Sequence, residues 1–219
     1  NRPGHEIIDH YTYAIVSDGD LQEGVASEAA SLAGTLRLGK LIYLYDDNDI
    51  SIEGNTDIAF AENVPEQFRA YGWHVVGPID GMDVEAVGAA LREAKEDTRR
   101  PSLIVCRTVI GYGSPAKAGT AAAHSEPLGE EEIRLTRERL GWPHAEPFVV
   151  PREAVDHFRE ARERGQSAQA QWQSRLDASR GAYPVEARQL DGALSGALPE
   201  GWDCDLDALF SADDKPIAT

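Results

Sequence analysis

The sequence predicts an α/β fold in which a parallel sheet is flanked by helices. Short, continuously apolar segments such as Leu41–Tyr45 and Leu103–Ile110 alternate along the chain with segments of helical periodicity. Continuous apolar runs are typical of parallel strands that are covered on both faces. The 219 residues are enough for one sizeable domain, or for one domain with an appendage. We therefore expect right-handed crossovers and helices on both sides of the sheet.

The first two strands of this sheet are expected before residue 46. Tyr11–Val16 is predicted to be a strand, Leu21–Leu38 a helix and Leu41–Tyr45 the next strand. Gly39 follows the helix as a stop signal. Five residues of the helix recur at helical spacing and are predicted to share its inward face: Val25, Ala29, Leu32, Ala33 and Leu36.

The second half of the sheet repeats the order helix then strand. Helices are predicted at Ala61–Tyr71 and Val84–Ala94, and strands at Trp73–Val76 and Leu103–Ile110. Asp83 is the predicted N-cap of the second helix, because its side chain can accept a hydrogen bond from the first turn. The predicted inward residues are Phe68 and Tyr71 in the first helix, and Val84, Val87, Ala90, Leu91 and Ala94 in the second.

The chain changes character after the fourth strand. Gly111–Gly129 is rich in Gly, Ala, Ser and Pro, which predicts a mobile or functional loop. Glu130–Leu140 is predicted to be a short helix with acids in its first turn, as the helix dipole favours. Val150–Pro151 is a candidate boundary, and Pro151 is expected near a helix start. We assign residues 1–150 to an α/β domain and residues 151–219 to a polar, mostly helical connector.

Composition excludes several classes of partner. The formal net charge of −17 argues against a nucleic-acid partner, whose phosphates need a basic surface. We expect no membrane-spanning helix, since no apolar run approaches ~20 residues, and no signal peptide in the polar stretch Asn1–His10. Cys106 and Cys204 predict neither a disulfide framework nor a zinc site. A cytoplasmic location is expected.

Polar side chains follow the first two predicted strands where each strand ends. Asp18 and Gly19 follow the first, in "VSDGDLQEG", and Asn48 follows the second, in "LYDDNDIS". Ligands of open α/β sheets bind beyond the carboxyl ends of the strands. A carboxylate there repels a bare diphosphate, whereas Mg²⁺ accepts oxygen ligands from both. Asp18, Asn48 and the main-chain carbonyl of Ile50 are therefore candidate ligands of one cation.

Acids at a strand end have other interpretations. An acid at a strand end is also typical of a helix N-cap, which is the alternative for Asp18. Asp46 and Asp47 are interpreted as a solvated turn. Acids at a strand end also occur in phosphoacceptor receiver domains, but those domains place their acids after the first and third strands, which is a different order from the one found here.

Asp18 and Gly19, followed thirty positions later by Asn48, resemble the thiamine-diphosphate motif, which is written GDG, a spacer and then N. "FRAYGWHVV", "IDGMD", "RPSLIVCRTVIGYGSPAKAGT" and "EIRLTRERLGW" extend the resemblance, in order, to the transketolase family. The resemblance covers nearly the whole chain and is most specific over Asn1–Trp142. It implies a thiamine-diphosphate-binding fold that is incomplete at its N-terminus, since the family's cofactor domain begins upstream of Asn1.

The resemblance also implies roles for individual residues. Asp18, Asn48 and the Ile50 carbonyl would bind Mg²⁺ or Ca²⁺, and Gly19 would contact the diphosphate. Glu23 matches a glutamate of a carboxylate network near the subunit interface, and His124 in "AAAHSEPLG" matches a histidine near the diphosphate and the sugar. A neutral imidazole there would hydrogen-bond to a reacting oxygen. The alternatives are a surface acid for Glu23 and an exposed histidine for His124.

The sequence departs from the family pattern at three positions. Ser17 occupies the place of the first glycine of the motif, Ala121 stands where many transketolases carry a histidine, and Ser125 stands where glycine is common. The last two changes place the geometry of the His124 loop in question. None of the three replaces a predicted metal ligand.

The resemblance implies a transferase of the pentose phosphate pathway that moves a two-carbon ketol unit from a ketose phosphate to an aldose phosphate. Its partners would be sugar phosphates, the remaining transketolase segments or subunit, and a second copy in a homodimer. We expect a central piece of such an enzyme, and no turnover from this chain alone. The alternatives are an inactive transketolase-like scaffold, or another thiamine enzyme such as a 1-deoxyxylulose-phosphate synthase or a pyruvate dehydrogenase.

Overall fold

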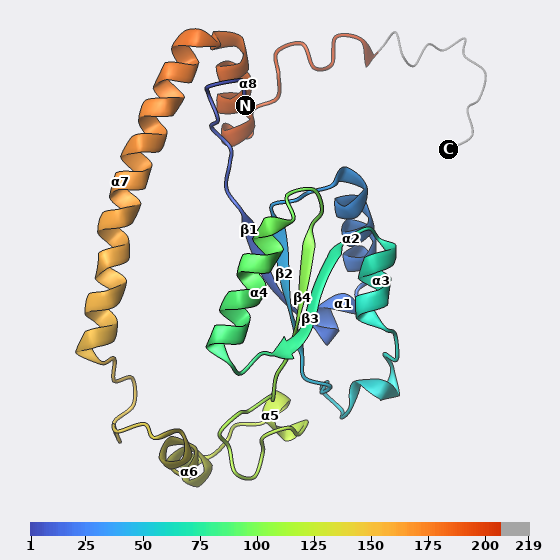
Figure 1. Ribbon diagram of the computed structural model, residues 1–219, viewed down its shortest axis with the longest axis vertical. Coiled ribbons are helices and arrows are strands. Elements are labelled where there is room, and N and C mark those ends of the chain that lie inside the picture. The colour runs from blue at the N-terminus through green and yellow to red at the C-terminus, as the bar shows by residue number, and fades with distance from the viewer. Residues whose placement is uncertain (207–219) are drawn as a thin grey trace, which may run out of the picture. The chain divides into compact units, whose positions relative to one another are not determined.

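The computed structural model describes residues 1–206, and within them it contains one four-stranded parallel sheet (Figure 1). The strands are β1 (Thr12–Ser17), β2 (Leu41–Asp47), β3 (His74–Asp80) and β4 (Ser102–Arg107). Their order in the sheet is β1-β2-β4-β3, so β4, the last strand in the sequence, lies between β2 and β3. The predicted parallel sheet flanked by helices is confirmed.

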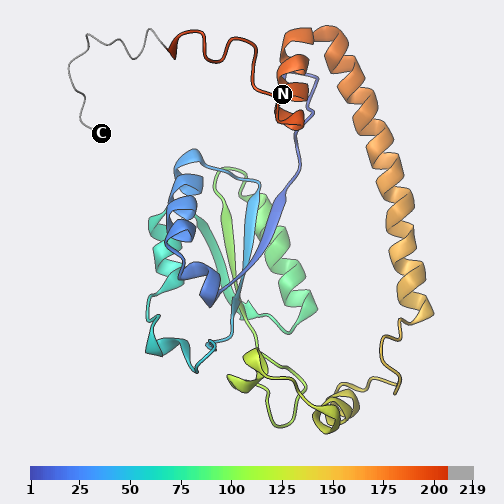
Figure 2. The ribbon, with the colours of Figure 1, turned by 180° about the vertical axis from the view of Figure 1, so that it is seen from behind.

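Helices connect the strands as predicted, but the predicted helix Leu21–Leu38 is interrupted at Gln22 and Glu23. After β1 come α1 (Asp18–Leu21) and α2 (Gly24–Leu36), and after β2 come the 3₁₀ turn η1 (Thr56–Ile58) and α3 (Val64–Ala70). Helix α4 (Val84–Glu96) joins β3 to β4, and the Asp83 side chain accepts a hydrogen bond from the Glu85 N–H, as expected of its N-cap. Figure 2 shows α2 and α3 on the face of the sheet opposite α4.

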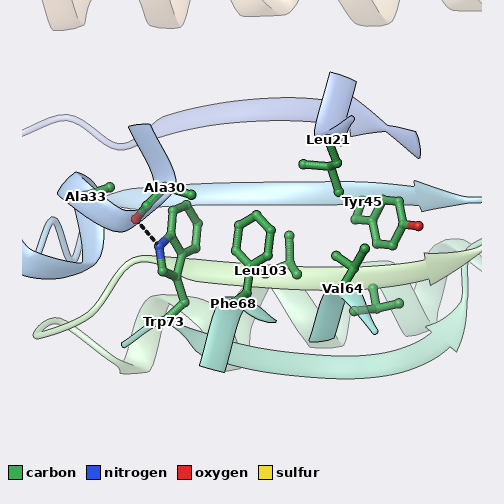
Figure 3. Close-up of a cluster of buried hydrophobic side chains, with 9 residues drawn as sticks. Leu21, Ala30, Ala33, Tyr45, Val64, Phe68, Trp73 and Leu103 are labelled. Carbon is green, nitrogen blue, oxygen red and sulfur yellow. Dashed lines mark hydrogen bonds between the residues drawn. The ribbon is translucent and has the colours of Figure 1, made fainter. Parts of the chain in front are cut away.

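The larger core lies between the sheet and the helices α1, α2 and α3. Trp73 is buried at the end of this core next to Ala30, contacts Tyr43 and Phe68, and donates a hydrogen bond from Nε1 to the Ala30 carbonyl at 2.8 Å (Figure 3). The other buried members are Leu21, Ala33, Tyr45, Val64, Phe68, Leu103 and Val105. A single indole thus joins α2 to the strand that follows α3.

The smaller core lies under α4. Ala90 and Ala94 pack on Ile42, Val76 and Ile104, with Leu91 partly buried beside them. The predicted inward face of α4 is therefore confirmed at these helix positions. Val84 is an exception, because its side chain is 82% exposed at the first turn of the helix.

Of the five residues predicted for the inward face of α2, only Ala33 is buried, so the prediction is wrong at the other four positions. Ala30 and Ala33 are buried, whereas Val25, Leu32 and Leu36 are 70%, 58% and 59% exposed. The buried face consists of small residues because the helix closely approaches the backbone that follows α3. A Cβ added to Gly34 would lie 1.8 Å from the Tyr71 carbonyl oxygen. The edge strand β1 likewise leaves Ile15 79% exposed.

Three strands differ in length from their predictions. β2 extends to Asp47 rather than to Tyr45. β3 extends to Asp80 rather than to Val76, with a break in its register to β4 between Val76 and Ile79. β4 ends at Arg107 rather than at Ile110. The backbone N–H of Thr108 still donates to the Asp47 carbonyl at 3.2 Å, but beyond this bond the chain turns into the loop.

The loop after β4 and the C-terminal segment carry four further helices among residues 1–206. They are α5 (Ala122–Ser125), α6 (Glu130–Leu140), α7 (Arg152–Ala182) and α8 (Pro184–Ser195). The bounds of α6 match the predicted helix, and Pro151 is the N-cap of α7. No helix in the part of the chain that the structure describes is long and apolar enough to cross a membrane.

Two compact units divide the chain. One is His10–Val149, and the other combines Asn1–Asp9 with the described residues from Val150 to 206. Within the second unit, Trp172 Nε1 donates to the Ile7 carbonyl at 2.9 Å, and Arg2 pairs with Glu186 at 2.7 Å. The first nine residues thus pack with α7 and α8. The assignment of residues 1–150 and 151–219 to two functional domains stays a prediction.

Candidate functional site

The carboxyl ends of three strands meet at one edge of the sheet. Ser17 of β1 is paired with Asp46 of β2, and Asp47 of β2 with Arg107 of β4. A pocket of about 490 Å³ opens at this edge, and its lining includes Asp18, Tyr45, Asp47, Asp49 and Arg107. Parallel register therefore gathers residues from three separate parts of the sequence.

Asp18 is the first residue of α1 and is only 4% exposed. The interpretation of Asp18 as an N-cap is wrong, because Ser17 occupies that position, and the Ser17 N–H donates to Asp20 Oδ2 at 2.8 Å. Tyr45 donates its hydroxyl hydrogen to Asp18 Oδ1. Burial raises the pKa of Asp18, and nearby Asp49 and Asp46 raise it further, while the Tyr45 hydrogen bond opposes them.

The second oxygen of this carboxylate has no hydrogen-bond partner within residues 1–206. Asp18 Oδ2 is buried and is without a hydrogen-bond partner among the described atoms. A buried unpaired carboxylate oxygen is costly and is rare in folded proteins unless a ligand completes it. A hard divalent cation is a suitable partner for such an oxygen. The residues at this strand end therefore fit a bound cation.

Asn48 follows β2 directly and its amide is held on both sides. Its Nδ2 donates to Asp46 Oδ2 at 3.3 Å, and its Oδ1 accepts from the Ile50 N–H at 3.0 Å. An amide oxygen has a second lone pair, so Oδ1 retains capacity for a cation. Asn48 and Ile50 are not in the pocket lining that includes Asp18. Convergence of Asp18, Asn48 and Ile50 on one ion stays a prediction.

Metal sites built from three or more His, Cys, Asp or Glu side chains differ from the cation site predicted here. In residues 1–206, no group of three or more His, Cys, Asp or Glu side chains is arranged to hold a metal ion. The predicted set contains one carboxylate, one amide oxygen and one main-chain carbonyl, so it does not belong to that class.

The interpretation of Asp46 and Asp47 as a solvated turn is wrong. Both residues belong to β2, and Asp47 is only 8% exposed. Asp47 Oδ2 pairs with Arg107 Nε at 3.1 Å, and Asp46 accepts a hydrogen bond from the Thr108 hydroxyl. Burial raises the pKa of Asp47, whereas the charge of Arg107 lowers it. Both acids are strand residues because β2 continues two residues beyond its predicted end.

Gly19 has no steric reason within the chain to be glycine. It lies in α1, is exposed, and a Cβ at this position would meet only Ser17 Oγ at 3.9 Å. The space beside it is open to a ligand, which agrees with the prediction that a diphosphate approaches this backbone closely.

The two predicted catalytic residues lie at the surface. Glu23 is the exposed N-cap residue of α2, and His124 is an exposed residue of α5. Neither lines the pocket that includes Asp18. Their catalytic roles stay predictions.

The loop that carries His124 is tied to α6. Glu132 of α6 accepts hydrogen bonds from the buried Ser114 hydroxyl and from the Ala116 N–H, the latter at 2.7 Å. These bonds lower the pKa of Glu132. Lys117 Nζ donates to the Pro127 carbonyl at 2.7 Å, across the segment that contains His124. The predicted functional loop is therefore fastened at both ends.

Sequence reasoning missed three residues of this strand edge, namely Tyr45, Arg107 and Thr108. A signal existed for Tyr45, which alternates with Tyr43 along β2 and so shares a face with it. Arg107 is the charged residue that ends the apolar run "SLIVCR". Neither signal identifies the partner across the sheet, which follows from strand order.

Comparison with known proteins gives a consistent result. The sequence model of the family described as "Transketolase, thiamine diphosphate binding domain" matches residues 1–199. The chain is 52% identical over 220 residues to a transketolase of Geobacillus stearothermophilus, which covers 100% of this chain and 33% of that relative. It is 50% identical over 203 residues to transketolase 2 of Escherichia coli, covering 93% and 30%.

Solved structures show the same likeness. A transketolase from Leishmania mexicana superposes with a TM-score of 0.85 at 40% identity, and a transketolase from Pichia stipitis complexed with sedoheptulose-7-phosphate superposes with 0.84 at 42%. Each match covers 93% of this chain and 30% of the other. The chain thus spans about a third of the length of the relatives that it matches.

Proposed function

The chain belongs to the transketolase family, and we propose that it binds the diphosphate of thiamine diphosphate through Mg²⁺ or Ca²⁺ at the carboxyl ends of β1 and β2. The observation that carries this proposal is the buried Asp18 Oδ2, which has no partner among the described atoms. A cation there would complete the carboxylate. It would also join a diphosphate to a protein of formal net charge −17.

The chain's own residues would hold the cofactor as follows. Asp18, Asn48 and the Ile50 carbonyl would supply oxygens to the cation, and Tyr45 fixes the orientation of the Asp18 carboxylate by its hydrogen bond. The open space at Gly19 would admit the diphosphate. When bound, thiamine diphosphate would supply the electron-accepting group needed to transfer a two-carbon ketol unit between sugar phosphates.

His124 and Glu23 have proposed roles away from the cation. His124 would donate a hydrogen bond to an oxygen of the sugar phosphate, and Glu23 would join a carboxylate network at a subunit interface. The proposed setting is a cytoplasmic homodimer in the pentose phosphate pathway, completed by further transketolase segments. The exposed apolar side chains of β1 and α2, including Ile15, Val25 and Leu32, support a protein partner.

Calorimetric titration of the full chain with thiamine diphosphate and Mg²⁺ tests the proposed site. Binding is expected in the unaltered chain, and Asp18→Ala should weaken it by more than the roughly 10- to 100-fold typical of changes outside the ligand set. Glu85→Ala is the matched control, because it removes an exposed negative charge of α4, outside the pocket that Asp18 lines.

The control should bind like the unaltered chain. Equal binding by Asp18→Ala and the unaltered chain would refute the site. An unaltered chain that folds but binds nothing would favour the alternative of a non-catalytic scaffold, which the Ala121 and Ser125 departures beside His124 motivate.

A further inference from the structure

One arginine holds both neighbours of Asn48. Arg107, the last residue of β4, places Nε 3.1 Å from Asp47 Oδ2 and Nη1 3.3 Å from Asp49 Oδ2. The Asp47 carboxylate is nearly buried, whereas the Asp49 side chain is largely exposed. A planar guanidinium fixes the relative directions of two carboxylates better than a point charge does. Arg107 thus contacts the residues on either side of Asn48, which the proposed function assigns to the cation.

Thr108 holds the amide of Asn48 through Asp46. The Thr108 hydroxyl donates to Asp46 Oδ1, and the Asn48 amide donates to Asp46 Oδ2 at 3.3 Å. The Thr108 N–H also donates to the Asp47 carbonyl at 3.2 Å. The Asp46 carboxylate thus receives both side chains and links Thr108 to the Asn48 amide.

The turn after Asn48 has a backbone conformation that needs support. Asp49 has φ +62°, in the left-handed region that glycine tolerates best. The Asp49 carbonyl accepts from the Thr56 N–H at 3.0 Å, and the Ile50 N–H donates to Asn48 Oδ1 at 3.0 Å. The Arg107 contact to the Asp49 side chain therefore secures the turn that places the Ile50 carbonyl.

We propose that Arg107 and Thr108 are positioning residues that set the Asn48 amide and the Ile50 carbonyl for the cation. The end of β4 thereby serves as an outer layer for ligands on the neighbouring strand end, as hydrogen-bonding partners commonly do around protein metal sites. This inference rests on the proposed function, since it assumes that Asn48 and Ile50 face a cation.

Removal of Arg107 should change the cation affinity in a direction that separates a positioning role from an effect of its positive charge. If Arg107 acted only as a positive charge near the site, its removal would relieve repulsion and tighten cation binding. If Arg107 positions the turn, its removal weakens binding. The two accounts predict opposite changes in the same measurement.

The first experiment measures Mg²⁺ affinity at a fixed thiamine diphosphate concentration in the full chain. Arg107→Met keeps much of the side-chain length and removes every donor, and it should weaken Mg²⁺ binding about 10- to 100-fold. Arg107→Lys, which retains one point of contact, should recover part of the loss. Arg134→Met is the matched control, since Arg134 also bridges two carboxylates, Glu131 and Glu138. The exposed fractions of the Arg134 and Arg107 side chains are similar, at 52% and 55%.

A second variant avoids any change of charge. Thr108→Val keeps the shape of the side chain and removes the hydroxyl, and it should weaken Mg²⁺ binding about 10-fold, the lower end expected for outer-shell partners. Thr108→Ser restores the donor and should restore the affinity. Thr108→Val decides the question if Arg107→Met fails to fold because Asp47 loses its buried ion pair.

Hydrogen exchange at the Ile50 amide, measured without ligand, separates failure of this inference from failure of the proposed function. The Ile50 N–H should exchange faster in Arg107→Met and Thr108→Val than in the unaltered chain, because its acceptor is Asn48 Oδ1. Unchanged exchange, or Mg²⁺ binding that is unchanged or tighter in a folded variant, overturns the positioning role of that residue. Absence of Mg²⁺ binding in the unaltered chain overturns the proposed function, while the exchange measurement still decides whether β4 holds the turn.

Discussion

Asp18 is a buried carboxylate whose two oxygens have different surroundings. Oδ1 accepts the Tyr45 hydroxyl hydrogen, while Oδ2 is buried without a partner among residues 1–206. Desolvation raises the pKa of Asp18 in the folded chain, and the Tyr45 hydrogen bond opposes this rise. The charged carboxylate is therefore held in place at a cost in stability, which a bound cation would offset.

Tyr45→Phe tests this balance. The change leaves both oxygens of Asp18 unpartnered, and it should lower the free energy of unfolding of the ligand-free chain by about 1–3 kcal/mol near neutral pH. The hydrogen bond favours the charged carboxylate, so its contribution is present at high pH. It should decline as pH falls through the folded-state pKa of Asp18, which lies above the ordinary value of 3.8.

Urea unfolding at neutral pH and at about pH 4, close to the ordinary carboxyl pKa, measures this difference. The same substitution in an Asp18→Asn background is the control and should cost less at neutral pH. A loss of equal size at both pH values, or in both backgrounds, would contradict the assignment of the effect to the charged form of Asp18.

For single residues, the sequence predicts the place in the fold better than the hydrogen-bond partner. It places Asp18 and Asn48 at neighbouring strand ends, and the register of β1 with β2 agrees. The Tyr45 contact to Asp18 and the Thr108 contact to Asp46 span 27 and 62 positions of sequence. Such pairs depend on which strands are neighbours, and local patterns do not specify that.

Helix α2 illustrates how small residues set the spacing between secondary-structure elements. Its inward side consists of the buried Ala30 and Ala33 and the half-buried Gly34, and this side allows the Trp73 indole to reach the Ala30 carbonyl. The larger apolar residues of α2 are exposed instead. Periodicity shows which residues share a face, but the face that meets the sheet depends on how close the helix must come.

Two glycine substitutions in helices should have opposite effects. Gly34→Ala places a Cβ 1.8 Å from the Tyr71 carbonyl oxygen, so α2 must shift, and we expect a loss of about 1–3 kcal/mol in the free energy of unfolding. Gly88→Ala in α4 meets only Arg92 Nη1 at 3.5 Å, and the higher helix propensity of alanine should add about 0.5–1 kcal/mol.

Denaturant unfolding of the two variants and the unaltered chain provides the measurement, and the chemical change is the same in both. A stabilising Gly34→Ala would show that α2 does not approach the Tyr71 backbone this closely. A destabilising Gly88→Ala would show that this surface of α4 is covered.

The described part of the chain forms two compact units, and the chain passes between them at Asp9–His10 and again at Val149–Val150, in the segment between α6 and α7. Residues 141–151 contain no helix or strand, and Phe148 within them is 99% exposed. Phe158 is also exposed, at 76%, but it lies inside α7. An exposed side chain in irregular backbone is a preferred site of proteolysis, whereas a helical one is protected.

Brief chymotrypsin digestion should therefore cut after Phe148 before it cuts after Phe158. Mass spectrometry of early fragments identifies the sites, and Phe148→Ser should remove the first cut without altering the free energy of unfolding. Earlier cleavage after Phe158 would contradict the described α7. Separate unfolding transitions of the two units in the uncut chain would support the predicted division into domains.

The sequence alone determined the alternation of strands and helices, the strand ends that carry Asp18 and Asn48, and the resemblance that led to the family. These are local properties, since hydrophobic period, terminating residues and short motifs are all written in consecutive positions. Only the tertiary structure decided which face of α2 is buried, which tyrosine holds Asp18, and that Arg107 holds both neighbours of Asn48. The strand order β1-β2-β4-β3 brings these distant residues together, because packing and register act between segments that are far apart in the chain.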